Sequence, residues 1–120
     1  MLPESTPGQA TVTVSAIVTG QITLPERFFV YPADKQASRT VPSLAFVITA
    51  ESKTPGAAPR RMMFDLGLRS SIYDYTPAQQ SHLANREPHE IGPGVSALLK
   101  QGGLNPRADI DKLGLARIIF

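Results

Sequence analysis

One acidic residue stands at the end of an apolar segment and is the clearest candidate for chemistry. Arg60 to Phe64 joins two cations to three large apolar residues, and Asp65 and Gly67 follow directly. An apolar run that ends in Asp-x-Gly predicts a buried strand that stops at a turn. A carboxylate in that place either accepts backbone N–H bonds within the turn or orients a group bound to a metal. The residues favour the first interpretation and leave the second open.

The two histidines do not have the spacing of a metal site. His82 and His89 lie seven positions apart. Ligands on one helix need a spacing of three or four residues, and a catalytic zinc ion needs three protein ligands. We interpret both histidines as surface residues, and the sequence predicts no metal ligand.

The chain also lacks the motifs that mark common catalytic and nucleotide sites. Serine, histidine and aspartate are all present, but no G-x-S-x-G segment marks a nucleophile. No P-loop and no G-x-G-x-x-G segment occurs, and Gly102-Gly103 is interpreted as the end of a helix. The sequence therefore predicts no catalytic residue.

Three strands are expected to position Asp65. Alternating residues predict a half-buried strand from Thr11 to Val18, which Gly20 ends or bends. Residues 41–49 predict a second strand, which is apolar on both faces and therefore internal to the sheet. After a loop at residues 51–59, the strand 61–66 is expected to run back antiparallel to it.

Aromatic residues occur in two segments without clear periodicity. In residues 21–33, Pro25 separates an aliphatic patch from an aromatic one. We interpret this segment as a loop that packs its aromatic side chains onto the core, and the alternative is a loop that lines a substrate pocket. In residues 68–75, Tyr73 and Tyr75 are candidates for packing or for lining a pocket.

Short helices are predicted after these strands. Thr76 is a suitable cap for a helix that ends near Ala84, and Val95 begins an amphipathic helix that Gly102-Gly103 ends. A helical turn is expected at residues 109–112, followed by a strand at residues 115–120.

Length and composition indicate one domain or part of one. The chain has 120 residues, of which 42% are hydrophobic and 18% are charged. This content is too apolar for a fully disordered protein. Residues 1–9 are polar, contain two prolines and are expected to form a flexible tail. Residues 10–120 then form the domain, for which an α+β fold is expected.

Charge and hydropathy restrict the classes of partner. The net charge is +2, and the cations are scattered, so the chain lacks the basic stripe of a nucleic-acid-binding protein. No apolar run approaches the ~20 residues of a membrane span, and the N-terminus lacks the features of a secretory signal. The absence of cysteine excludes disulfides and thiolate ligands. We expect a soluble cytoplasmic protein without nucleic-acid or membrane partners.

The last segment is apolar and has no cap, turn or polar tail. The final residues of an isolated domain are usually its least ordered. We therefore expect the chain to be a fragment, or a truncated gene product, of a longer protein.

Several segments, taken in order, resemble the N-terminal part of the metallo-β-lactamase superfamily, especially its lactonase-like members common in fungi. Pro42 to Ile48 is similar to the family's P-S-x-x-F-L-I strand, and Arg61 to Arg69 is similar to its R-x-L-F-D-L-G-x-R segment. The segment beginning at Thr76, the helix ending in Gly102-Gly103 and the strand ending at Phe120 follow in the family's order. The resemblance covers about residues 10–120.

This resemblance implies the N-terminal half of an αββα sandwich, with a mostly antiparallel sheet and flanking short helices. Full-length members are zinc-dependent hydrolases of lactones, esters or thioesters, and their H-x-H-x-D-H metal motif would follow Phe120. No metal ligand of the family therefore falls on this chain, which would bind no cofactor itself. Asp65 and Gly67 match the family's strand-end Asp-x-Gly, and Tyr73 and Tyr75 fall in a pocket-side region.

Three hypotheses follow from the sequence. The first is a truncated metallo-β-lactamase-fold hydrolase, which is inactive as this fragment and acts on a small ester or lactone when full-length. The second is a metal-free binding or scaffold protein that retains half of the sandwich. The third is a non-functional truncated gene product, whose half-sandwich would expose an apolar face.

Overall fold

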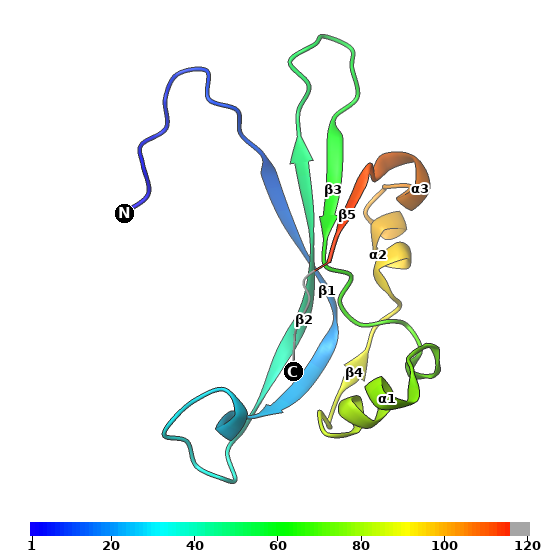
Figure 1. Ribbon diagram of the computed structural model, residues 1–120. Helices are drawn as coiled ribbons and strands as arrows, with labels where there is room; N and C mark the ends of the chain where they lie inside the picture. Colours follow the sequence, from blue (N-terminus) through cyan, green and yellow to red (C-terminus); the bar gives the residue numbers. More distant parts are fainter. Residues whose placement is uncertain (116–120) are drawn as a thin grey trace.

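The computed structural model describes residues 1–115 as a five-stranded sheet with a few short helices (Figure 1). The described chain is thus a mixed structure of helices and strands, as predicted. The strands are β1 (Thr13–Pro25), β2 (Ser38–Ala50), β3 (Arg60–Phe64), β4 (Glu90–Ile91) and β5 (Lys112–Gly114). The helices are α1 (Pro77–Ala84), α2 (Val95–Gln101) and α3 (Pro106–Asp109), with 3-10 turns η1 (Glu26–Phe28) and η2 (Ile72–Asp74).

The strand order is β4-β1-β2-β3-β5, so β2 lies in the middle of the sheet. This confirms the prediction from its apolar residues on both faces. The pairs β1–β2, β1–β4 and β2–β3 are antiparallel, whereas β3–β5 is parallel. The predicted antiparallel return of residues 61–66 is also confirmed, since β3 pairs with β2 from Arg60 to Phe64.

The first hairpin is longer than the sequence predicted. Strand β1 passes Gly20 and pairs with β2 as far as Pro25, with a register irregularity between Val18 and Gly20. Gly20 therefore bends the strand and does not end it. A Cβ atom at Gly20 would lie 2.3 Å from the carbonyl oxygen of Glu90, so the close pairing of β4 requires glycine here.

The interpretation of residues 21–33 as a loop is wrong for its first part, because residues 21–25 belong to β1. The register with β2 continues through Ile22↔Val41 and Leu24↔Arg39. Cross-strand pairing overrides the break that Pro25 suggested, since a proline is tolerated at a strand end.

The two faces of the sheet have different surroundings. The covered face, defined here as Ile17, Ala45, Val47 and Met63, packs against Leu99 of α2, with Val95 beside it. The open face consists of the alternate residues, which the register places side by side (Val14, Ala16, Val18, Leu44, Phe46, Ile48, Met62 and Phe64). None of the open-face residues is buried.

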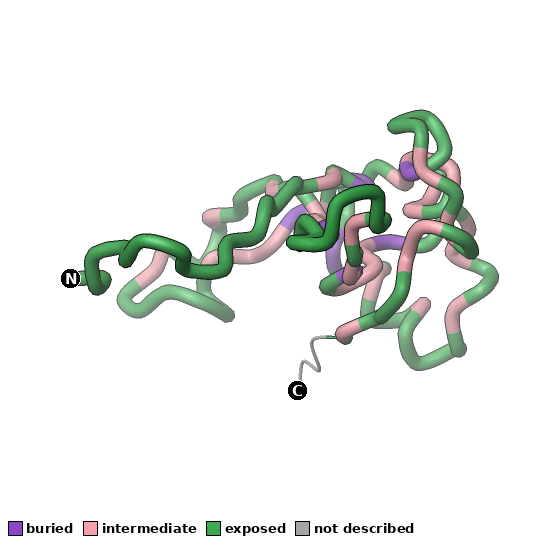
Figure 2. The backbone as a smooth tube through the Cα atoms, turned by 90° about the horizontal axis from the view of Figure 1, so that it is seen from above, coloured by how far each residue is buried: buried purple, intermediate pink, exposed green. Residues whose placement is uncertain are grey.

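Figure 2 shows that the buried stretches gather in the middle of the molecule, while the N-terminal segment is exposed along its length. Residues 1–12 precede the first strand and extend away from the sheet (Figure 1). Within residues 1–115, no helix has the length and apolarity needed to cross a membrane.

The helices begin where their capping residues predict. Thr76 and Gln79 form a reciprocal capping box at the start of α1, and Gly102 follows the last residue of α2. The predicted helical turn at residues 109–112 begins too late. Asn105 accepts hydrogen bonds from the backbone of residues 107 and 108, so α3 starts at Pro106 and ends at Asp109.

The C-terminal strand predicted at residues 115–120 falls mainly on residues 116–120, which lie outside the described part of the chain. The strand that the structure does describe there is β5, which ends at Gly114 and pairs with β3.

Candidate functional site

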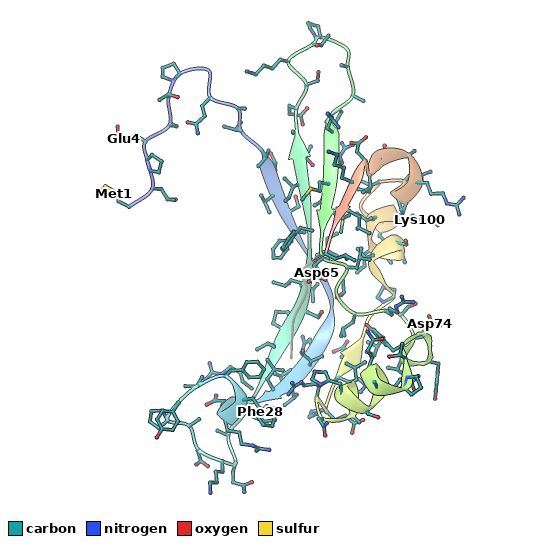
Figure 3. All side chains as sticks on the ribbon, in the orientation of Figure 1. Met1, Glu4, Phe28, Asp65, Asp74 and Lys100 are labelled. Atoms are coloured by element: carbon teal, nitrogen blue, oxygen red, sulfur yellow. The ribbon has the colours of Figure 1, made fainter. Side chains whose placement is uncertain are left out.

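Asp65 lies where two parallel strands end together. Strands β3 and β5 pair in parallel, with Phe64 opposite Gly114. The backbone N–H of Asp65 donates to the carbonyl oxygen of Gly114 at 2.7 Å, which extends this pairing by one residue. Figure 3 shows Asp65 in the middle of the molecule, at the end of β3. The carboxyl ends of neighbouring parallel strands are a common location for functional groups.

The backbone of Asp65 is strained in a way that its own side chain stabilises. Its φ angle is +62°, in the left-handed region, and it is the only non-glycine residue among residues 1–115 with a positive φ. Its Oδ1 accepts from the N–H groups of Leu66 at 2.6 Å and Gly67 at 3.1 Å. Aspartate tolerates this conformation because such local hydrogen bonds are available to it.

The two oxygens of this carboxylate have different surroundings. Oδ1 accepts the two backbone hydrogen bonds that stabilise the turn, which is the structural role that the sequence predicted for Asp65. Within residues 1–115, Oδ2 makes no hydrogen bond. One oxygen of Asp65 therefore remains able to accept a bond from another group at the strand edge.

Gly67 allows the turn to pack against β1. Its φ angle is +58°, and a Cβ atom there would lie 2.0 Å from Oγ1 of Thr19. Thr19 is fully buried, and its hydroxyl donates to the carbonyl of Ser43 and accepts from the N–H of Leu68. The hydroxyl thus joins β1, β2 and the Asp65 turn.

Thr19 is a positioning residue that sequence reasoning missed. Gly92 also packs on it: its N–H donates to the Thr19 carbonyl at 3.1 Å, and a Cβ atom there would lie 2.5 Å from the same oxygen. A threonine directly before a glycine in a strand was the only signal in the sequence. Three glycines make close contacts with other segments: Gly20 with the backbone of Glu90, and Gly67 and Gly92 with Thr19. These contacts cannot be inferred from the sequence, because they form only when the strands are paired.

The two candidate tyrosines differ in their surroundings. An open groove of about 330 Å³ lies beside the Asp65 turn, between residues 66–70 and residues 93–96, and Tyr75 lines it. The Tyr75 hydroxyl accepts from the N–H of Arg69 at 2.8 Å, and the Arg69 guanidinium lies 5.7 Å from the ring centroid. Tyr73 is 82% exposed and is not among the residues that line the groove.

The sequence interpretation expected the aromatic residues of the first hairpin to pack onto the core, and this expectation is wrong. Phe28, Phe29 and Tyr31 are exposed, because the continued β1–β2 pairing carries this segment to the hairpin tip, where Figure 3 labels Phe28. Phe28 and Phe29 line a pocket of about 500 Å³ together with residues of α1 and with Arg86.

The described residues do not supply a zinc site. Within residues 1–115, no three histidine, cysteine or acidic side chains lie close enough to hold one metal ion. His82 is exposed and lies beside Arg86, with 3.4 Å between Nε2 and Nη2. His89 is half-buried, and its Nδ1 is buried without a hydrogen-bond partner among these residues. A zinc-binding motif would have to come from other residues.

Comparisons with protein-family models, with curated proteins and with solved structures found no match to this chain. A functional proposal must therefore rest on the sheet, on the Asp65 turn and on the order of the sequence segments.

Proposed function

We propose that this chain forms the N-terminal part of an αββα sandwich of the metallo-β-lactamase type. The intact protein would be a metal-dependent hydrolase of esters, lactones or thioesters, and the chain by itself would be inactive. The open face of the sheet is the observation that carries this proposal. In a sandwich of this type, the helices of this half would cover one face and a second sheet would cover the other.

The open face has the character of an interior surface. Val14 is 58% exposed and Phe64 is 41% exposed, and both lie in rows of apolar side chains across the strands. Monomeric proteins seldom expose a contiguous apolar patch of more than a few hundred Å². Two sheets that pack about 10 Å apart bury such faces between them.

The strand edge at Asp65 gives a second line of support. Because β3 and β5 are parallel, a segment that follows β5 would emerge at the edge where Asp65 lies. In the family that the sequence resembles, the metal motif follows a strand at this place in the order. Asp65 would then form part of the floor of the site, with Oδ1 holding the turn and Oδ2 facing the added groups.

The described residues lack a metal-binding set, so no catalytic step is assigned to them. Their part in the proposed hydrolase is to shape one edge of the site. The Thr19–Gly67 contact fixes the turn, and the groove beside Tyr75 offers room for part of a small substrate.

The coding sequence beyond the codon for Phe120 tests this proposal most directly. An H-x-H-x-D-H motif just downstream would support it, and its absence would refute it. Where the motif is present, the longer protein should contain bound zinc by elemental analysis and should hydrolyse a test lactone. The Asp65→Asn variant of that longer protein keeps the oxygen acceptor for the turn but removes the negative charge. A loss of hydrolysis with unchanged stability would show that the charge serves the active site and not the fold.

A metal-free binding protein is the second candidate, and the pocket at the hairpin tip favours it. That pocket is lined by residues of the first hairpin, of α1 and of the segment after α1, and Figure 3 shows its lining residue Phe28 well away from Asp65. Zinc analysis and denaturation of the 120-residue chain discriminate between the candidates. A cooperatively folded, metal-free monomer favours the binding protein, whereas self-association through the open face favours the half-sandwich.

A cytoplasmic location stays a prediction from the sequence.

A further inference from the structure

The pocket at the hairpin tip has a cationic lining. It has a volume of about 500 Å³, within the range of small-molecule sites. Its lining residues include two arginines and no acidic side chain (Pro25, Arg27, Phe28, Phe29, His82, Asn85 and Arg86). The pocket is formed by the first hairpin on one side and by α1 with the residues after it on the other.

Among residues 1–115, Arg86 is a buried cation without a carboxylate partner. It is only 6% exposed, its Nη2 lies 3.4 Å from Nε2 of His82, and its Nη1 is buried with no hydrogen-bond partner in this part of the chain. The ion pair between Arg39 and Glu26 does not involve Arg86. A buried charge that is neither paired nor fully hydrogen-bonded is unfavourable, so this arrangement points to a missing anion.

The backbone holds Arg86 firmly in this place. Its N–H donates to the carbonyl of Leu83 at 2.8 Å, and its own carbonyl accepts from the N–H of Thr23 at 3.0 Å. The first bond extends the hydrogen bonding at the end of α1, and the second connects Arg86 to strand β1. The guanidinium is thus carried by two ordered elements, which favours a pre-formed site.

Aromatic rings surround the guanidinium groups. The Arg86 Cζ atom lies 5.8 Å from the ring centroid of Phe28 and 5.7 Å from that of Phe29. The Arg27 Cζ atom lies 4.7 Å from the Phe28 centroid, so two cations flank one ring. These contacts offset part of the charge. The two phenylalanines also offer exposed apolar surface at the pocket.

We propose that this pocket binds an organic carboxylate with a flat apolar body. The carboxylate pairs with the guanidinium group of Arg86, with Arg27 as a second cation, and the apolar body lies against Phe28 and Phe29. An inorganic phosphate ion would satisfy the charge but would leave the exposed apolar surface of both rings uncovered. The inference does not depend on the proposed hydrolase activity, because it uses no residue of the Asp65 turn.

Equilibrium dialysis of the 120-residue chain against labelled benzoate tests the proposal. This measurement counts bound ligand whether or not the chain self-associates. Benzyl alcohol, which has the same ring without the charge, should bind about tenfold more weakly or worse, because the charge-assisted hydrogen bond is lost. Inorganic phosphate should also bind more weakly than benzoate.

Substitutions locate the bound benzoate. Arg86→Lys keeps the charge but removes the guanidinium donors, and should weaken binding about tenfold. Arg27→Gln and Phe28→Leu change exposed residues and should each weaken it about threefold, which tests the site even if Arg86→Lys unfolds the chain. Arg107→Gln removes an exposed cation of α3 and should leave binding unchanged.

Three results would overturn the proposal. The first is the absence of benzoate binding by the unsubstituted chain. The second is equal binding of benzoate and benzyl alcohol, which would show that the charge is irrelevant. The third is an equal loss in Arg107→Gln and Arg27→Gln, which would show a non-specific response to net charge.

Discussion

Both faces of the sheet carry apolar side chains, but these side chains differ in how far they are buried. On the covered face, Ala45, Val47 and Met63 are buried beneath Leu99 of α2. On the open face, their chain neighbours Phe46 and Ile48 are half-buried and Phe64 is exposed. Burial in the described part of the chain is therefore not decided by residue type alone.

The sizes of the side chains explain which face the helices take. Ala45 and Val47 are small, so the short helix α2 can lie close to the sheet through Leu99. The open face carries bulkier groups, among them Phe46 and Phe64, which pair across β2 and β3. A face of this kind suits a broad partner such as a second sheet better than a single short helix.

Two neighbouring methionines give the strongest test of the difference between the faces. Met63 is 2% exposed on the covered face, and Met62 points to the open face. Met63→Ala should lower the free energy of unfolding by about 2–5 kcal/mol, since it leaves a cavity in the core. Met62→Ala should lower it by less than about 1 kcal/mol. Urea denaturation followed by circular dichroism measures both.

These two variants change the same side chain by the same number of atoms, so each serves as the control for the other. Equal losses would mean that the open face is covered in solution, for instance by self-association. Repeating the denaturation at several protein concentrations would distinguish that case, because stability would then rise with concentration.

The second prediction concerns the contact between Gly67 in the Asp65 turn and Thr19 of β1. Gly67→Ala should lower the free energy of unfolding by about 2–4 kcal/mol, since it combines a left-handed φ with an overlap against Thr19. Gly103→Ala is the matched control: its φ is also positive, at +82°, but nothing lies within 4 Å of a Cβ atom. It should lower stability by only about 1–2 kcal/mol. Similar losses would show that the contact with Thr19 can relax.

Local signals in the sequence predicted the central hairpin and the ends of α1 and α2. Strand β2 was recognisable because apolar residues on both faces indicate an internal strand, and α1 because Thr76 and Pro77 mark its start. The extent of β1 was missed although Gln21 to Leu24 alternate between polar and apolar residues, because Gly20 and Pro25 suggested breaks on either side. Pairing with residues 38–42 of β2 carries the strand past Gly20.

The candidate site was predictable only in part, for the same reason. Asp65 and Gly67 were evident because the turn is local and its chemistry is carried by adjacent residues. Thr19 and Arg86 were missed because their roles depend on partners far along the chain, such as Leu68 for Thr19 and Phe28 for Arg86. No periodic pattern records contacts of that kind.

The third prediction separates the two interpretations of Asp65 at the edge of the sheet. Asp65→Ala removes the acceptor for Leu66 and Gly67 and should lower the free energy of unfolding by about 1–3 kcal/mol. Asp65→Asn keeps a side-chain oxygen and tolerates the left-handed φ, so it should change stability by less than about 1 kcal/mol. Thermal denaturation compares the two. An Asn variant as unstable as the Ala variant would show that the negative charge itself stabilises the turn.

The smallest change in stability is expected on the open face, although the change in assembly there should be large. Val14→Lys places a charge at a position that is 58% exposed, and should alter the free energy of unfolding of the monomer by no more than about 0.5 kcal/mol. If the open face is an interior surface without its second sheet, the unsubstituted chain should self-associate through it, and the lysine should reduce that association. Sedimentation velocity over a range of concentrations measures this self-association.

Thr13→Lys is the matched control, since Thr13 is exposed at the neighbouring position of β1 and points to the opposite face. An unsubstituted chain that stays monomeric, or an equal effect of the two lysines, would show that the open face is an ordinary solvated surface, and the half-sandwich proposal would lose its main support.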